Sequence, residues 1–215
     1  MIGLWPGTGI GGGIIVNGEM VGGATNSAGE IGHMTIKAGG PVCACGGKGH
    51  LESLASRTAI VRDIAERVAN GEKTALTAIV GSDVTRATSS DLIEALRQGD
   101  KLVIRVLDRA AKYLSIGIAS LANILNPEIV VLGGGLIQAL GDPFVRQIAE
   151  KVKGRPMIAA TQSLTIVQSV LGDDAGIIGA ALIARRLAND SPHVSDNHAS
   201  DGATAIGVAD GVAEH

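Results

Sequence analysis

The chain has 215 residues, a formal net charge of −3 and 46% apolar residues, which suits one domain with a substantial core. Trp5, Tyr113 and Phe144 are its only aromatic residues, so aliphatic side chains must fill most of that core. The net charge is slightly negative, whereas nucleic-acid-binding proteins usually carry an excess of basic residues. No apolar run reaches the roughly 18 residues of a membrane span, and the first residues do not resemble a signal peptide. We therefore expect a cytoplasmic protein whose present segment binds neither nucleic acid nor membrane.

Strand and helix signals alternate along the chain, which indicates an α/β fold. Asn17-Gly18 predicts a tight hairpin near the N-terminus, because both residues tolerate positive φ. The predicted strands are residues 2–5, 13–16, 19–21, 128–132 and 164–170. The predicted helices are residues 51–69, 90–97, 100–125, 142–153 and 175–187. Residues 189–215 lack hydrophobic periodicity, and we expect a disordered tail there.

Four residues of the types that bind zinc lie between positions 33 and 50. His33, Cys43, Cys45 and His50 offer two imidazoles and two thiols, a set that can complete a tetrahedral site. The glycines and the proline between them argue against a regular buried element, and a disulfide within Cys-x-Cys would be strained. The alternative is two buried thiols and two surface histidines. We favour a structural zinc site, because four protein ligands leave no position for a catalytic water.

Two glycine-rich turns are candidate ligand sites. GTGIGGG, beginning at Gly7, lies between two predicted strands, where successive amides can cradle an anion and Thr8 adds a hydroxyl. It is not a P-loop, because no Lys-Ser/Thr follows. Gly133–Gly135 follow a predicted buried strand, at the end where α/β sheets bind ligands. From these residues alone, a flexible turn is as good an interpretation of the first segment, and a tight strand–helix connection is a slightly better one of the second.

Glu30 and Glu52 lie on either side of the predicted zinc loop. Carboxylates held beside an ordered loop could accept hydrogen bonds from the hydroxyls of a polyol. Taken one at a time, glutamates are usually solvated surface charges, and the residues alone favour that interpretation for both.

The chain resembles the ROK family of bacterial sugar kinases and repressors over residues 2–187. The resemblance is carried by GTGIGGGIIVNGEMVGGATNSAGEIGHMTI, the Cys-x-Cys-Gly-x-x-Gly loop, LESLAS, NPEIVVLGGGL and GDDAGIIGAALIA. It implies an actin-like ATPase fold of the ribonuclease H-like type, with residues 1–188 as one lobe of two and residues 189–215 as the tail. In this family ATP and sugar bind in the cleft between the lobes.

The resemblance also implies three groups of binding residues, matched by position. The ATP-binding group is Gly7, Thr8, Gly9, Gly133, Gly134 and Gly135. The sugar-binding group is Glu30, His33 and Glu52. The zinc group is His33 through its other ring nitrogen, Cys43, Cys45 and His50, which stands where the family usually has a third cysteine.

The activity implied by the resemblance is phosphorylation of a hexose, glucose to glucose 6-phosphate, with ATP and Mg²⁺ as substrate and structural Zn²⁺. A homo-oligomer acting in glycolysis is also implied. The family's catalytic base is an aspartate of an N-terminal lobe, and neither that lobe nor its Asp-x-Gly-Gly-Thr turn has a counterpart in this sequence. We therefore expect no catalytic residue here and impaired phosphorylation. Two alternatives stay open, the sugar-sensing part of a ROK-type transcriptional repressor and a zinc-stabilised remnant without catalysis.

Overall fold

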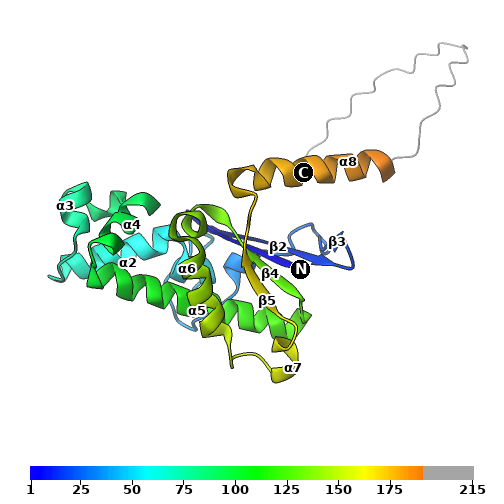
Figure 1. Cartoon of the computed structure of the whole chain (residues 1–215), viewed down its shortest axis with the longest axis horizontal. Helices are drawn as coiled ribbons and strands as arrows, with labels where there is room; N and C mark the ends of the chain where they lie inside the picture. The colour runs from blue at the N-terminus through cyan, green and yellow to red at the C-terminus, as the bar shows by residue number, and fades with distance from the viewer. Residues whose placement is uncertain (191–215) are drawn as a thin grey trace, which may run out of the picture. The chain divides into compact units, whose positions relative to one another are not determined.

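The computed structural model describes residues 1–190 and is built around one five-stranded sheet (Figure 1). The strands are β1 (Ile2–Pro6), β2 (Ile10–Val16), β3 (Glu19–Met20), β4 (Ile129–Leu132) and β5 (Thr165–Gln168). Their order across the sheet is β3-β2-β1-β4-β5. β1, β2 and β3 form an antiparallel meander, and β4 and β5 continue the sheet parallel to β1. The predicted hairpin is confirmed, since Asn17 and Gly18 both have positive φ between paired β2 and β3.

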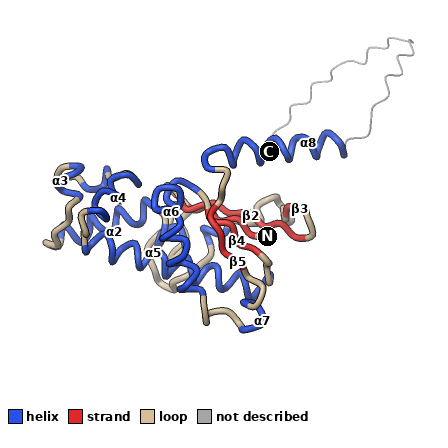
Figure 2. Tube along the Cα trace, viewed as in Figure 1, coloured by secondary structure: helices blue, strands red, loops and turns tan. Residues whose placement is uncertain are grey.

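Helices make up most of the remaining structure (Figure 2). They are α1 (Leu51–Ala55), α2 (Arg57–Ala69), α3 (Leu76–Val80), α4 (Ser89–Arg97), α5 (Lys101–Leu125), α6 (Gly134–Val152), α7 (Ile158–Thr161) and α8 (Ala175–Asp190). Three short 3-10 helices are η1 (Ile31–His33), η2 (Val84–Arg86) and η3 (Gly172–Asp174).

The core lies between the sheet and the long helices α5 and α6. Ile2 and Leu4 of β1 and Leu132 of β4 are buried on one face of the sheet, as the alternation of side chains along a strand requires. α6 packs against β1 and β5, and α5 packs against α6 and α1. Small residues on α5 allow close approach of these elements. A Cβ on Gly117, for example, would lie 3.1 Å from the Leu51 side chain of α1.

Three sequence predictions differ from the structure. The predicted helix 51–69 is interrupted at Ser56, whose ψ of 162° is extended and whose hydroxyl caps α2 by accepting from the Ala59 amide. The predicted helix 142–153 matches the part of α6 that follows the non-helical Gly141, but the helical segment before it, from Gly134 to residue 140, was not predicted. The polar stretch after Gly71 holds α3, which the sequence did not predict.

Residues 1–175 form one compact unit, and the described part of the second unit is α8, which extends to Asp190. The predicted tail from 189 onward thus starts within this helix, and its remainder, 191–215, lies outside the described residues. Within residues 1–190 no helix combines the length and the apolar character needed to cross a membrane.

Candidate functional site

The two predicted ATP-binding segments lie side by side at the carboxyl edge of the sheet. Leu4 of β1 pairs with Leu132 of β4, so the turns that follow both strands leave the sheet together. The Gly133 amide donates to the Leu4 carbonyl at 3.0 Å. Gly134 has φ of +81°, and a Cβ there would lie 2.7 Å from the Pro6 carbonyl oxygen. Only glycine permits this close approach, which places the segment against the turn at Gly7.

The start of α2 holds the turn formed by Gly7, Thr8 and Gly9, which we call the phosphate turn. The Arg57 amide donates to the Gly7 carbonyl at 2.8 Å, and its guanidinium donates to Thr8 Oγ1 at 2.9 Å. The Thr58 hydroxyl donates to the Thr8 carbonyl at 2.8 Å. Sequence reasoning missed Arg57 and Thr58. No local signal marks them, because their partners lie some 50 residues earlier in the chain.

The four predicted metal ligands come together in one cluster. His33, Cys43, Cys45 and His50 each offer a ligand atom, and these atoms lie within 4.8 Å of one another. Cys43 Sγ is 3.7 Å from His33 Nδ1, and Cys45 Sγ is 3.2 Å from His50 Nδ1. Bond lengths to tetrahedral zinc of about 2.0–2.3 Å correspond to separations between ligands of about 3.4–3.8 Å. The donor set and its spacing therefore fit a zinc ion after a contraction of less than about 1.5 Å.

Backbone hydrogen bonds fold the loop around this cluster. The Cys43 amide donates to Gly47 O, the Gly46 amide donates back to Cys43 O, and the Gly49 amide donates to Pro41 O. A Cβ on Gly49 would lie 1.7 Å from the Lys37 carbonyl oxygen, so this close crossing of two chain segments needs a glycine. The cysteines are therefore not two unrelated buried thiols, since Cys43 is buried while Cys45 is exposed and both face histidines.

Burial raises the pKa of the Cys43 thiol, and this thiol donates a hydrogen bond to Glu52 Oε1 at 3.4 Å. Glu52, in the first turn of α1, accepts a second hydrogen bond at Oε2 from the Ile10 amide, at 2.9 Å. A Cβ on Gly9 would lie 2.4 Å from the same oxygen. Glu52 therefore lies between the metal cluster and the phosphate turn.

Glu30 and His33 form the other side of this arrangement. The 3-10 helix η1 sets the two residues three positions apart, with His33 Nε2 3.8 Å from Glu30 Oε2. His33 thus directs Nδ1 toward Cys43 and Nε2 toward Glu30. The Glu30 side chain is 64% exposed, so one carboxylate faces solvent beside a ring whose other nitrogen faces the metal cluster.

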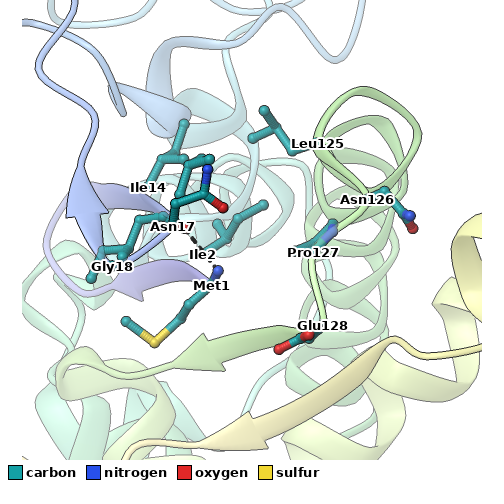
Figure 3. A pocket seen from close by; sticks show the side chains of 11 residues that line it. Met1, Ile2, Ile14, Asn17, Gly18, Leu125, Asn126, Pro127 and Glu128 are labelled. Atoms are coloured by element: carbon teal, nitrogen blue, oxygen red, sulfur yellow. Dashed lines mark hydrogen bonds between the residues drawn. The ribbon is translucent and has the colours of Figure 1, made fainter.

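A cavity of about 270 Å³ adjoins the phosphate turn and is lined by Thr8, Gly9, Cys43 and Glu52, among others. A larger cavity, of about 450 Å³, lies at the opposite edge of the sheet, where β1 and β4 begin (Figure 3). Its lining mixes apolar residues such as Met1, Ile14 and Pro127 with the polar Asn17, Asn126 and Glu128. Ligands of parallel α/β sheets bind at the carboxyl ends of the strands, so the phosphate-turn edge is the candidate site.

The ROK family model matches residues 1–187 of this chain, and the chain belongs to that family. It is 36% identical over 185 residues to a glucokinase of Thermotoga maritima, covering 86% of this chain and 58% of that protein. It is 35% identical over 179 residues to a xylose repressor of Caldicellulosiruptor bescii, covering 83% of this chain and 44% of that protein. A ROK family glucokinase from Streptomyces griseus was solved in complex with glucose and AMPPNP. It matches the structure with a TM-score of 0.75 and 29% identity, covering 86% of this chain and 60% of that one.

These similarities confirm the predicted family and the predicted fold class. The chain has an α/β fold of the actin-like ATPase type, with its three-stranded meander extended by two parallel strands. It spans between about two fifths and three fifths of the length of these relatives. The roles of individual residues in binding ATP, sugar and zinc stay predictions.

Proposed function

We propose that this chain forms the hexose- and ATP-binding part of an ATP-dependent hexose kinase of the glucokinase type. The observation that carries the proposal is the position of Glu52, which contacts the end of the phosphate turn through Ile10 and the metal cluster through Cys43. A hexose bound at Glu52 would thus have the phosphates of ATP next to it. The similarity to glucokinases supports the same assignment.

The proposed sugar site consists of Glu30, His33 and Glu52. Two carboxylates accept hydrogen bonds from sugar hydroxyls, and each contact to a charged group contributes about 1.5–3 kcal/mol. The imidazole of His33 adds a polar contact through Nε2, the nitrogen that faces Glu30. Carboxylates and an imidazole suit a polyol better than an apolar ligand.

The proposed ATP site consists of Gly7–Gly9 for the phosphates and Gly133–Gly135 for the adenosine, with Mg²⁺ accompanying the nucleotide. Phosphoryl transfer depends on positioning and charge stabilisation, which backbone amides at a glycine turn can provide. A general base would add about 10²–10⁴-fold, and we assign no such base to this chain. Because ATP and hexose are cytosolic substrates, we place the protein in the cytoplasm.

The fit of the cluster supports a structural zinc ion held by His33, Cys43, Cys45 and His50. When bound, zinc supplies a cross-link that fixes the loop without an open coordination position for substrate. His33 faces Glu30 through Nε2, so a zinc ion on Nδ1 would hold the imidazole next to this proposed sugar-binding carboxylate. Glu52 lies beside Cys43, whose thiol would give up its proton on binding zinc.

Isothermal titration of the zinc-loaded chain with glucose tests the proposal, with N-acetylmannosamine, fructose and allose as comparison sugars. We expect saturable hexose binding that Glu30→Gln weakens about tenfold or more. Glu128→Gln is a matched control, because Glu128 lines the cavity at the opposite edge of the sheet. Glucose-dependent ADP release should be slow. Turnover at the about 1–100 s⁻¹ typical of kinases would overturn our view that this chain holds no base, and absence of any hexose binding would overturn the function itself.

The sugar-sensing part of a ROK-type repressor is a second candidate, favoured by the 35% identity to the xylose repressor. A sensor binds its sugar without needing ATP. Nucleotide titration therefore separates the candidates, since ATP binding next to the sugar favours the kinase and xylose binding without ATP binding favours the sensor. Hexose and ATP binding with no measurable turnover would instead support a zinc-stabilised remnant.

A further inference from the structure

The phosphate turn has no lysine of its own, unlike a P-loop, yet a cation contacts it from α2. Arg57 Nη2 donates to Thr8 Oγ1 at 2.9 Å, and Nη1 donates to the Ala87 carbonyl at 3.4 Å. Both acceptors are neutral. The Arg57 charge is therefore held at the turn by groups that do not cancel it.

Neighbouring arginines differ from Arg57 in this respect. Arg62 lies 3.9 Å from Glu66, and Arg67 pairs with both Asp63 and Glu72. Among the side chains that the structure describes, no carboxylate lies within ion-pair distance of Arg57. A partly exposed guanidinium without a carboxylate partner is available to bind an anion.

The backbone of the turn is oriented by the same helix. The Gly7 and Thr8 carbonyls accept from the Arg57 amide and the Thr58 hydroxyl, so the negative ends of these two peptide groups face α2. Both carbonyl oxygens are thus satisfied by donors of α2. A cavity of about 270 Å³ lies beside the turn and is lined by Thr8, Gly9, Thr58 and Glu52, among others, so an anion there would lie next to Thr8, whose hydroxyl Arg57 contacts.

We propose that Arg57 is the phosphate-binding cation of this turn, and that its guanidinium contacts the terminal phosphate of bound ATP while holding the Thr8 hydroxyl in position. This proposal rests on the proposed kinase function and adds a residue to it. A guanidinium is suited to the task because its planar fork can bind two phosphate oxygens and stabilise the charge that develops during transfer.

Titration calorimetry of the full zinc-loaded chain with ATP, tripolyphosphate and adenosine tests the proposal. Arg57→Gln keeps an amide donor for Thr8 and removes the charge, whereas Arg57→Lys keeps the charge and removes the fork. We expect Arg57→Gln to weaken ATP and tripolyphosphate binding about 10- to 100-fold and to leave adenosine binding unchanged. Arg57→Lys should recover part of the loss. Arg97→Ala is the control, since Arg97 is 74% exposed on α4.

Each outcome decides between the two proposals. Tripolyphosphate and ATP affinities of Arg57→Gln within twofold of wild type would overturn the role of Arg57 and leave the kinase proposal intact. Equal losses for adenosine and tripolyphosphate would also overturn it, because they indicate a disturbed fold. Charge-dependent tripolyphosphate binding without hexose binding would support the role of Arg57 and overturn the kinase. Wild-type protein that binds neither ATP nor tripolyphosphate would overturn both.

Discussion

Substitution of Asp100 is expected to destabilise the protein strongly, because this side chain joins two helices. Asp100 is 8% exposed and precedes α5, where Oδ1 accepts from the Leu102 and Val103 amides at 2.8 and 3.0 Å. Oδ2 accepts from the Thr74 hydroxyl and the Ala75 amide, both at 2.6 Å. One carboxylate thus caps α5 and fixes the segment that leads into α3.

The expected loss in the free energy of unfolding follows from these four hydrogen bonds. Loss of a helix N-cap costs about 1–2 kcal/mol. Each remaining hydrogen bond to a charged group is worth about 1.5–3 kcal/mol at most, and the two share one oxygen. We therefore expect Asp100→Ala to lower the free energy of unfolding by about 3–5 kcal/mol. Asp100→Asn keeps the shape, and its one amide oxygen can still cap α5, but its NH₂ group cannot accept from Thr74 and Ala75, so we expect a cost of about 2–3 kcal/mol.

The contribution of Asp100 to the free energy of unfolding should fall at low pH. Burial alone raises the Asp100 pKa, but the hydrogen bonds from Thr74, Val103, Ala75 and Leu102 together outweigh it, and the pKa lies below its ordinary value of 3.8. The unfolded chain therefore binds the proton first as the pH falls. The stabilisation is present above about pH 4 and is lost as the pH falls through the lowered folded-state pKa.

Urea unfolding followed by circular dichroism, at pH 7 and at steps down to about pH 3, measures this effect. The difference in the free energy of unfolding between wild type and Asp100→Asn should shrink below about pH 4. Asp142→Asn is the control, because the ion pair between Asp142 and Arg146 is exposed and should contribute less than about 1 kcal/mol. A difference for Asp100→Asn that stays constant with pH, or that is absent at pH 7, would refute the reasoning.

Two further predictions concern the loop that carries the candidate metal ligands and the 3-10 helix η1. Cys43→Ser, which replaces the buried metal ligand, should reduce the zinc content measured by mass spectrometry, and His50→Ala should do the same; unchanged zinc in His50→Ala would remove His50 from the site. Gly32→Ala should cost about 1–3 kcal/mol and weaken hexose binding, because a Cβ there would lie 2.1 Å from a β2 carbonyl oxygen and displace η1. Gly13→Ala, with no atom within 4 Å of the added Cβ, should be nearly neutral in thermal melts.

The sequence determined the features that depend on local preference. Asn17-Gly18 specified the hairpin through its tolerance of positive φ, and Asp100 and Asn126 mark the two ends of the longest helix. The four candidate metal ligands could be selected from the sequence because their types and spacing restrict the chemistry, and the structure brings them together. The family motifs indicated the fold class.

Tertiary structure decided which distant residues meet. Ser56 interrupts a sequence with helical periodicity, because the next residue, Arg57, donates its amide to Gly7 and starts a new helix there. Glu52 and Arg57 look like ordinary surface charges in the sequence. The roles that we propose for them come from contacts with Ile10 and Thr8, more than 40 positions away. Local preference holds no information about such partners, because only the packing of α1 on β2 and the contact of the start of α2 with the turn after β1 bring them within hydrogen-bonding distance.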